Sequence, residues 1–220
     1  MRNEIALMTK SKLFAGITKE ECRALHQMLQ PSMRKFRKDQ IVVNEREPVK
    51  HIGIVATGAV ASHKFYYQGD SHLIQIYGPG DAFGIEWAFS SLGTYSVTLV
   101  ALQDTEILTI PQAMLVSKLN DGPIGRIIND NVIKELADET VRKTYKLEVL
   151  SKKSLHERIK IFLFIIRDKT GSDCFHIGMN QQQFAQYLCV NRSTLSYELN
   201  EMRRNGEISF EKDFFTIHNL

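Results

Sequence analysis

The sequence predicts an α+β protein: an N-terminal antiparallel β-barrel of jelly-roll type, then one long helix, then a C-terminal winged helix-turn-helix. Three observations favour this order: short apolar runs at regular spacing in residues 36–111, a helical stripe in residues 123–150, and two short helices before a hairpin in residues 179–217. The chain has 220 residues, of which 43% are hydrophobic, so it can bury more than one core.

The strand-like runs of the first half are rich in Val, Ile, Tyr and Phe and are broken by Gly, Asp and Asn. Regular short strands of this kind indicate an antiparallel barrel or sandwich. The expected strands are residues 40–44, 51–57, 58–67, 71–77, 95–101 and 105–110. Before them, Thr18 and Glu21 form a possible capping box at the start of a short helix.

One long helix is expected from residue 123 to about residue 150. A narrow stripe runs along one of its faces: Ile124, Ile128, Val132, Leu136, Val141, Thr144 and Leu147. Such a stripe favours contact with a partner helix, and therefore a homodimer, while packing on the chain's own barrel is the alternative. A second, more apolar helix is expected over residues 155–167, so the last domain begins near Lys152.

Residues 179–208 have the pattern of two short helices joined by a tight turn. Asn180 is a plausible N-cap for the first helix, and Ser193 or Thr194 is placed to start the second. Apolar residues recur at helical spacing and are expected to be buried: Phe184, Ala185, Leu188, Leu195, Leu199 and Met202. Two strand-like runs on either side of residues 211–213 then predict a β-hairpin wing.

The opposite face of the second helix carries polar side chains that can bind phosphates and base edges in a major groove. They are Arg192, Ser193, Ser196, Tyr197 and Asn200. Any amphipathic helix pair in a small domain shows a similar pattern, and the wing behind it is what favours DNA binding. The formal net charge of +3 permits a nucleic-acid partner without requiring one.

Several other classes of protein are disfavoured. Cys22, Cys174 and Cys189 form no Cys-x-x-Cys pair, which argues against a zinc site or a disulfide framework. No apolar run approaches the roughly 20 residues that span a membrane, and residues 1–8 lack a signal-peptide core, so a cytoplasmic protein without a membrane partner is expected. No nucleophile–base pair, metal triad or phosphate loop is apparent, so the chain is not expected to be an enzyme.

Three motifs follow one another along the chain: Gly-Ala-Val at residues 58–60, Gly-Pro-Gly-Asp-Ala-Phe-Gly at residues 78–84, and Arg-Ser-Thr-Leu-Ser-Tyr at residues 192–197. In this order they resemble the cyclic AMP receptor protein and FNR family of bacterial transcription regulators, over nearly the whole chain. The resemblance implies a homodimer on a near-palindromic double-stranded DNA operator, with RNA polymerase as a plausible further partner. It implies a cyclic-nucleotide-binding-like sensing domain, a dimerisation helix and a DNA-binding domain at residues 1–118, 119–151 and 152–220.

By the same resemblance, Arg192, Ser193 and Tyr197 occupy the positions that face bases. Ser193 replaces a common glutamate and Tyr197 a common arginine, so the operator is expected to diverge from the family's usual one. Further positions match contacts to phosphates, which helix N-termini generally favour: Asn180, Gln182, Asn191 and Thr194.

The resemblance also places the family's phosphate-binding segment at residues 84–96. Where the family has Gly-Glu-Leu and then Arg-Ser, this chain has Gly-Ile-Glu at residues 84–86, and Tyr95 followed by Ser96. A buried phosphodiester needs a partner of opposite charge, so cyclic AMP is not expected as the ligand. An iron–sulfur cluster is not expected either, because Cys22 alone cannot replace a set of four cysteines.

What remains is a pocket for an unknown small-molecule effector, with an aromatic and aliphatic lining. The expected lining is Tyr77, Phe83, Gly84, Ile85, Glu86, Trp87, Tyr95, Ser96 and Val97. Three alternatives stay open: these residues simply fill the barrel, the regulator is constitutive, or the C-terminal domain binds protein instead of DNA.

Overall fold

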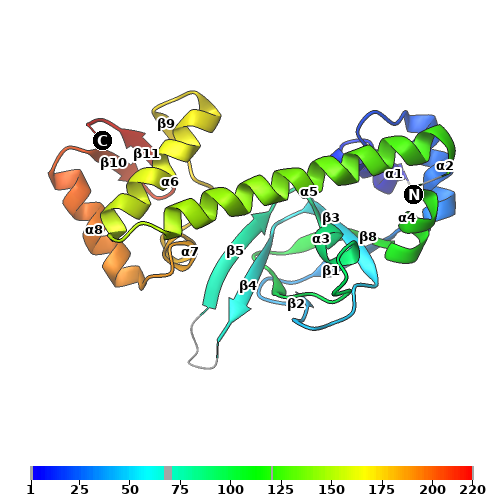
Figure 1. Ribbon diagram of the computed structural model, residues 1–220, viewed down its shortest axis with the longest axis horizontal. Helices are drawn as coiled ribbons and strands as arrows, with labels where there is room; N and C mark the ends of the chain where they lie inside the picture. The colour runs from blue at the N-terminus through cyan, green and yellow to red at the C-terminus, as the bar shows by residue number, and fades with distance from the viewer. Residues whose placement is uncertain (1, 67–70, 120, 220) are drawn as a thin grey trace. The chain divides into compact units, whose positions relative to one another are not determined.

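The computed structural model describes residues 2–66, 71–119 and 121–219. The chain forms two compact units, which we call the first unit (Met1–Glu139) and the second unit (Thr140–Leu220). The predicted long helix is confirmed as α5 (Gly122–Leu150), and it contributes residues to both units (Figure 1).

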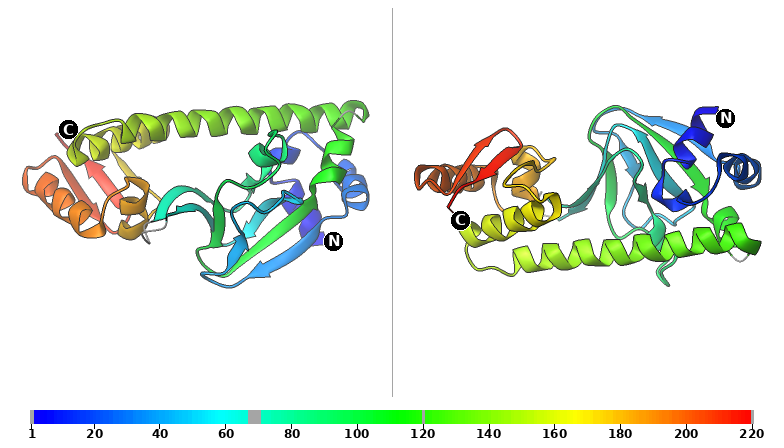
Figure 2. Two further views of the ribbon diagram at one scale, coloured as in Figure 1. Left: turned by 60° about the horizontal axis from the view of Figure 1, so that its bottom comes forward. Right: turned by 90° about the horizontal axis from the view of Figure 1, so that it is seen from above.

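Two four-stranded antiparallel sheets form the centre of the first unit (Figure 2). One has the strand order β1-β8-β3-β6 and the other the order β2-β7-β4-β5. The strands are β1 (Ser32–Phe36), β2 (Ile41–Val43), β3 (His51–Thr57), β4 (Val60–Phe65), β5 (Ser71–Tyr77), β6 (Ala82–Phe83), β7 (Thr98–Ala101) and β8 (Thr105–Pro111). Residues of both sheets share one buried cluster, so the predicted jelly roll is confirmed as two facing sheets.

The observed strand bounds differ from the predicted ones at particular places. β1 was not expected, because Phe36 is its only fully buried residue and its centre is charged. β7 begins at Thr98 instead of residue 95, since the backbone N–H of Tyr95 donates to the Glu47 carbonyl (3.0 Å) in a connecting loop. The strand expected over residues 58–67 ends at Phe65, and residue 67 lies outside the described residues.

Helices cover the outer face of the β1-β8-β3-β6 sheet. They are α1 (Arg2–Met8), the short 3₁₀ helix Lys12–Phe14, α2 (Lys19–Leu29), α4 (Gln112–Lys118) and the start of α5; α3 (Ile85–Ala88) follows β6. α2 has the predicted capping box, because the Thr18 hydroxyl accepts from the backbone N–H of Glu21 and the Glu21 carboxylate accepts from that of Thr18. Outward-facing Ile52 and Ile54 of β3 are buried beneath these helices.

The stripe on α5 is divided between two environments. Ile128 and Val132 are buried in the first unit's core. For these residues, the alternative prediction, that the stripe packs on the chain's own barrel, is confirmed. Val141 and Leu147, by contrast, are 50% and 70% exposed. The first half of the stripe therefore covers the chain's own sheet, and the second half is uncovered on this chain.

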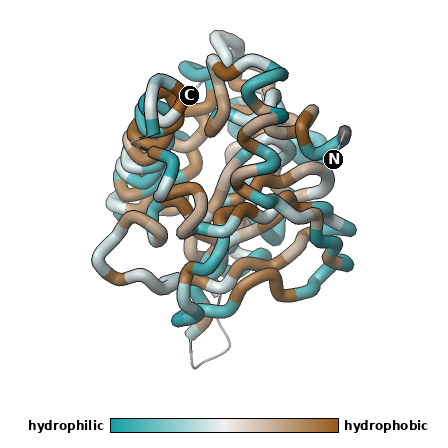
Figure 3. The backbone as a smooth tube through the Cα atoms, turned by 90° about the vertical axis from the view of Figure 1, so that its right-hand side faces the viewer, coloured by the Kyte–Doolittle hydropathy of each residue, from teal (hydrophilic) through white to brown (hydrophobic). Residues whose placement is uncertain are grey.

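The second unit holds three further helices and a three-stranded sheet. Its elements are α6 (Leu155–Thr170), β9 (Cys174–His176), α7 (Gln181–Tyr187), α8 (Arg192–Arg204), β10 (Ile208–Glu211) and β11 (Phe214–Ile217). The predicted wing is the β10–β11 hairpin, and β9 adds a strand that the sequence did not predict. Apolar and polar stretches alternate along the backbone (Figure 3), and the apolar residues predicted for α7 and α8 are all buried.

Candidate functional site

The helix-turn-helix is fixed at three points along its backbone. The Asn180 side chain accepts from the backbone N–H of Gln183 (2.9 Å), and the Gln183 side chain accepts from that of Asn180 (2.8 Å), so the predicted N-cap is part of a full capping box. Cys189 has a left-handed backbone (φ 57°) that turns the chain between the helices. α8 begins at Arg192 instead of Ser193 or Thr194, because the extended backbone of Asn191 occupies the N-cap position.

The side of α8 opposite its buried residues is open to solvent. We call Arg192, Ser193 and Tyr197 the reading face; all three are exposed, and Tyr197 is 65% exposed. Ser196 and Asn200 are half-buried beside them. The Asn200 side chain donates to the Ser196 carbonyl (2.8 Å) and accepts from Arg203 (2.7 Å), so its amide is already engaged within the helix.

A hollow of about 630 Å³ lies beside the start of α8. Its lining is Gly178, Met179, Asn180, Gln181, Arg192, Lys212 and Asp213. The wing turn thus brings Lys212 into the lining of the same hollow as Arg192, while the Asp213 carboxylate lies 3.2 Å from His176. Two cations in one hollow suit a DNA phosphate, and the sequence alone did not single out Lys212 because only the folded wing places it there.

The remaining predicted DNA contacts flank this surface. Asn180, Gln182, Asn191 and Thr194 are exposed at the starts of α7 and α8. The fold therefore brings the predicted base and phosphate contacts onto adjoining helix starts of the second unit.

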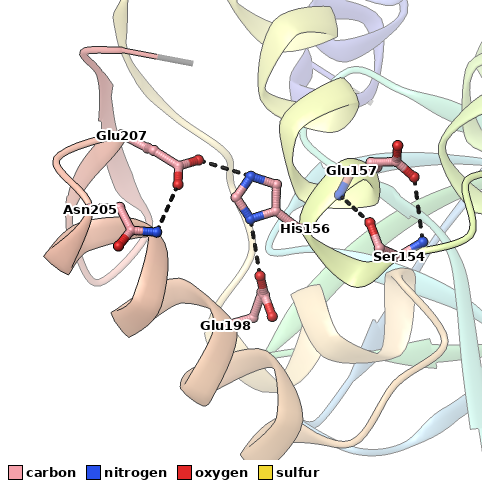
Figure 4. A network of polar contacts seen from close by, with 6 residues as sticks. All are labelled: Ser154, His156, Glu157, Glu198, Asn205 and Glu207. Atoms are coloured by element: carbon pink, nitrogen blue, oxygen red, sulfur yellow. Dashed lines mark hydrogen bonds and ion pairs between the residues drawn. The ribbon is translucent and has the colours of Figure 1, made fainter.

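His156 of α6 contacts both α8 and the turn between α8 and β10 (Figure 4). Its Nδ1 lies 3.1 Å from Glu198 Oε1, and its Nε2 lies 2.9 Å from Glu207 Oε2. Asn205 Nδ2 donates to the other oxygen of Glu207 at 3.1 Å. A carboxylate can only accept a hydrogen bond. The contacts to Glu198 and Glu207 are therefore both hydrogen bonds when Nδ1 and Nε2 of His156 each carry a hydrogen. One side chain thus orients the helix that carries the reading face.

Replacing His156 with alanine is expected to lower the free energy of unfolding of the protein by about 1 to 3 kcal/mol, because two partly buried carboxylates lose their shared partner. Urea denaturation followed by circular dichroism measures the loss. The matched control is His176→Ala, since His176 is more exposed and contacts a single carboxylate; its expected cost is about 0 to 1 kcal/mol. Equal losses in the two variants would contradict the role given to His156.

In the first unit, the residues predicted to line an effector pocket mostly fill the space between the sheets. The buried ones are Tyr77, Phe83, Ile85, Trp87, Tyr95 and Val97. The rings of Trp87 and Tyr95 pack at a centroid distance of 5.1 Å, and Trp87 Nε1 donates to Ser96 Oγ at 3.0 Å. This packing favours the alternative in which these side chains form core.

In the segment that aligns with the family's phosphate-binding segment, the Tyr95 side chain packs over Gly84. Gly84 opens α3 with a φ of 94°, and a Cβ built on it would lie 2.9 Å from the Tyr95 hydroxyl. That hydroxyl donates to the His51 carbonyl at 3.1 Å. Burial, and then the carboxylates of Glu86 and Glu47, raise the pKa of Tyr95. A neutral phenol at this position carries no positive charge to pair with a buried phosphodiester.

The cysteines are scattered, as the sequence indicated: Cys22 is buried in the first unit, while Cys174 is exposed and Cys189 half-buried in the second. Within the described residues, no group of three His, Cys, Asp or Glu side chains is arranged to hold a metal ion. Among the described helices, none has the length and apolar character needed to cross a membrane.

The two units match two known domain families. Residues 33–121 match the Cyclic nucleotide-binding domain, and residues 157–220 match the Crp-like helix-turn-helix domain. We call the two facing sheets of the first unit, formed by β1 to β8, the sensor roll. Such a roll followed by this kind of helix-turn-helix defines a DNA-binding transcription regulator. The chain belongs to the Crp/Fnr family of such regulators.

Its relatives align over nearly the full length of the chain. It is 18% identical over 218 residues to the global nitrogen regulator of Nostoc sp., covering 96% of this chain and 95% of the relative. It is 23% identical over 211 residues to the CRP-like cAMP-activated global transcriptional regulator of Mycobacterium tuberculosis, covering 93% of this chain and 91% of the relative.

Solved structures share the fold. FixK2 from Bradyrhizobium japonicum superposes with a TM-score of 0.68 at 22% identity, covering 86% of this chain and 93% of that one. The c-di-GMP responsive global regulator CLP of Xanthomonas campestris superposes with a TM-score of 0.71 at 15% identity, covering 89% of this chain and 97% of that one.

Proposed function

We propose that this regulator binds a near-palindromic double-stranded DNA operator as a homodimer, and that a small-molecule effector in the sensor roll changes its operator affinity. The observation that carries the proposal is the exposed reading face of α8, with Arg192 beside the Lys212 ammonium of the wing. Residues 1–118 serve as the sensing domain, residues 119–151 as the dimerisation helix and residues 152–220 as the DNA-binding domain.

The reading face supplies the base contacts. The Arg192 guanidinium grips guanine O6 and N7 in bidentate fashion, which is worth about 1 to 3 kcal/mol of discrimination against another base. Ser193 and Tyr197 contact neighbouring bases, and the exposed Tyr197 ring adds apolar surface that an arginine would not. Asn180, Gln182, Asn191 and Thr194 contact phosphates, which set the register of the protein on DNA.

The uncovered half of the α5 stripe, together with the neighbouring exposed residues Ile133 and Ala137, forms the dimer contact. Ile133, Val141 and Leu147 are exposed large apolar side chains on one helix, and Ala137 and Thr144 are exposed small ones between them. Their spacing of three to four residues is that of a two-helix seam. A twofold dimer presents two α8 helices to half-sites about 34 Å apart, or one turn of DNA.

The effector acts by favouring one arrangement of the dimer over another, a coupling of typically about 1 to 3 kcal/mol. The Tyr95 side chain over Gly84 supports an effector other than cyclic AMP. The protein acts in the cytoplasm, without catalysis of its own, and RNA polymerase is its plausible partner at promoters.

Selecting bound DNA from a randomised duplex library with the full-length protein identifies the operator, and an Arg192→Ala variant then tests the assignment. Loss of a bidentate base contact is expected to weaken operator binding by about 5- to 150-fold. The matched control is Arg167→Ala, an arginine of α6 that stacks on Phe164 and lies outside the reading face. If Arg192→Ala binds the operator as tightly as the control variant does, the assignment of Arg192 as a base contact is wrong.

The salt dependence of binding distinguishes DNA binding from the alternative function, in which the second unit binds a protein. DNA binding should weaken steeply as salt rises from about 50 to 200 mM, because counterions are released from phosphates. A library selection that enriches no sequence, with salt-independent retention of a protein partner, would favour the rival.

A further inference from the structure

A cavity of about 180 Å³ opens at one end of the sensor roll, on the inner face of the β1-β8-β3-β6 sheet. Its inner wall is apolar and includes Phe36, Val43, Phe83 and Tyr95, of which only Val43 is not fully buried. The Phe83 ring forms part of this wall, and its tip packs so closely on the backbone of Gly53 in β3 that a side chain at residue 53 would clash with it. The cavity shares Phe83 and Tyr95 with the predicted effector lining, while its other lining residues were not among those predicted.

Cationic side chains gather at the mouth of this cavity. Arg34 of β1 lies there with its guanidinium 5.3 Å from the Phe36 ring centroid, and Lys50 and His51 line the cavity at the start of β3. Partial burial, and then the charges of Arg34 and Lys50, lower the pKa of His51. The two permanent cations therefore act on the same small volume.

One carboxylate, that of Glu47, also lines the mouth. Its Oε1 accepts from the backbone N–H and from the side-chain amide of Asn44, at 3.1 and 2.5 Å. This oxygen is thus satisfied within the loop. Two permanent cations against one engaged carboxylate leave the mouth with an excess of positive charge.

We propose that this cavity binds a small organic monocarboxylate with a single ring, whose carboxylate pairs with Arg34 and whose ring lies against Phe83 and Tyr95. A guanidinium and a carboxylate form a bidentate, charge-assisted pair. An apolar cavity of about 150 Å³ holds one benzene ring, so the size of this one suits a single ring.

Tyr95 connects this cavity to the segment that follows β6, so a bound ligand can affect the conformation of that segment. The Tyr95 hydroxyl donates to the His51 carbonyl and lies over Gly84, so a ring against Tyr95 contacts a side chain that itself packs on the segment following β6. Only this regulatory consequence rests on the proposed function. Binding itself is a property of the first unit and is measured without DNA.

The test titrates sodium benzoate into the full-length protein at constant ionic strength, using isothermal titration calorimetry without DNA. Saturable binding with a stoichiometry of one per chain is expected. Arg34→Gln is expected to weaken it by about 10-fold or more, because a charge-assisted pair is lost. The matched control is Lys35→Gln, which removes a cation from the same strand; Lys35 pairs with Glu106 outside the cavity and should change the affinity less than about twofold.

Two further measurements test the contribution of the ligand's charge and guard against misfolding of the variant. Benzamide keeps the ring without the charge and should bind at least about 10-fold more weakly than benzoate. Should Arg34→Gln fail to fold by circular dichroism, Val43→Phe, which fills the cavity from β2, replaces it and should abolish binding. Absence of benzoate binding to the wild type, or equal affinities for Arg34→Gln and Lys35→Gln, would overturn the proposal.

The outcome for DNA is scored separately. Benzoate that binds but leaves operator affinity unchanged keeps the site and removes its regulatory role. Absent benzoate binding together with Arg192-dependent operator binding overturns this site and leaves the proposed function standing.

Discussion

Replacing both Val141 and Leu147 with aspartate is expected to convert the dimer into monomers and to weaken operator binding by at least about 100-fold, the gain that two linked binding modules typically have over one. Each substitution places a carboxylate beside its twofold copy in an apolar seam, where unpaired charge is costly. Both side chains are exposed on the single chain, so its fold should tolerate the change.

Sedimentation velocity measures the mass, and fluorescence anisotropy with a labelled operator measures the affinity. The control is Lys153→Asp, which also introduces an aspartate at an exposed position but lies after the end of α5 and so outside the seam. A double variant that remains dimeric, or a monomer with unchanged operator affinity, would refute the assignment of the seam.

Replacing Phe184 with alanine is expected to lower the free energy of unfolding of the second unit by about 3 to 5 kcal/mol, the usual cost of removing a buried phenylalanine. Phe184 is 1% exposed and packs between Phe162 of α6, at a centroid distance of 4.8 Å, and Phe215 of β11, at 6.1 Å. It therefore joins the first helix of the helix-turn-helix to both the preceding helix and the wing.

Native-state hydrogen exchange, resolved by unit, measures this loss. The control is Phe214→Ala, since Phe214 is 37% exposed on the neighbouring position of β11 and contacts His176; its expected cost is below about 1 kcal/mol. Similar losses for the two phenylalanines would show that Phe184 is not the centre of the second unit's core.

Elements with a strong apolar pattern could be predicted from the sequence. β3 and β5 match the expected bounds because apolar runs there end at turn residues, and the capping box at Thr18 and the N-cap at Asn180 are local patterns of residue type. β1 escaped prediction because most of it is solvated, and β9 because a strand of three residues has too little pattern.

Some residues of the candidate sites could likewise be predicted from the sequence, and others could not. The reading face was predictable, since helical spacing alone separates Arg192 and Tyr197 from Leu195 and Leu199. Lys212 was not, because its place beside Arg192 depends on how the wing folds back. The cavity at Arg34 was also beyond the sequence, since it depends on the Phe83 ring lying against Gly53 across two strands.

The division of the α5 stripe bears on how the regulator responds to its own abundance. Half of the stripe is buried within the chain, so a dimer seam built from the rest and from the neighbouring Ile133 offers only a few large apolar side chains, among them Val141 and Leu147. Below the dissociation constant of such a dimer, the concentration of dimers rises with the square of the chain concentration, by mass action. A twofold change in expression would then change the supply of operator-binding species about fourfold. The gene's own expression level would thereby become a second input, alongside any effector.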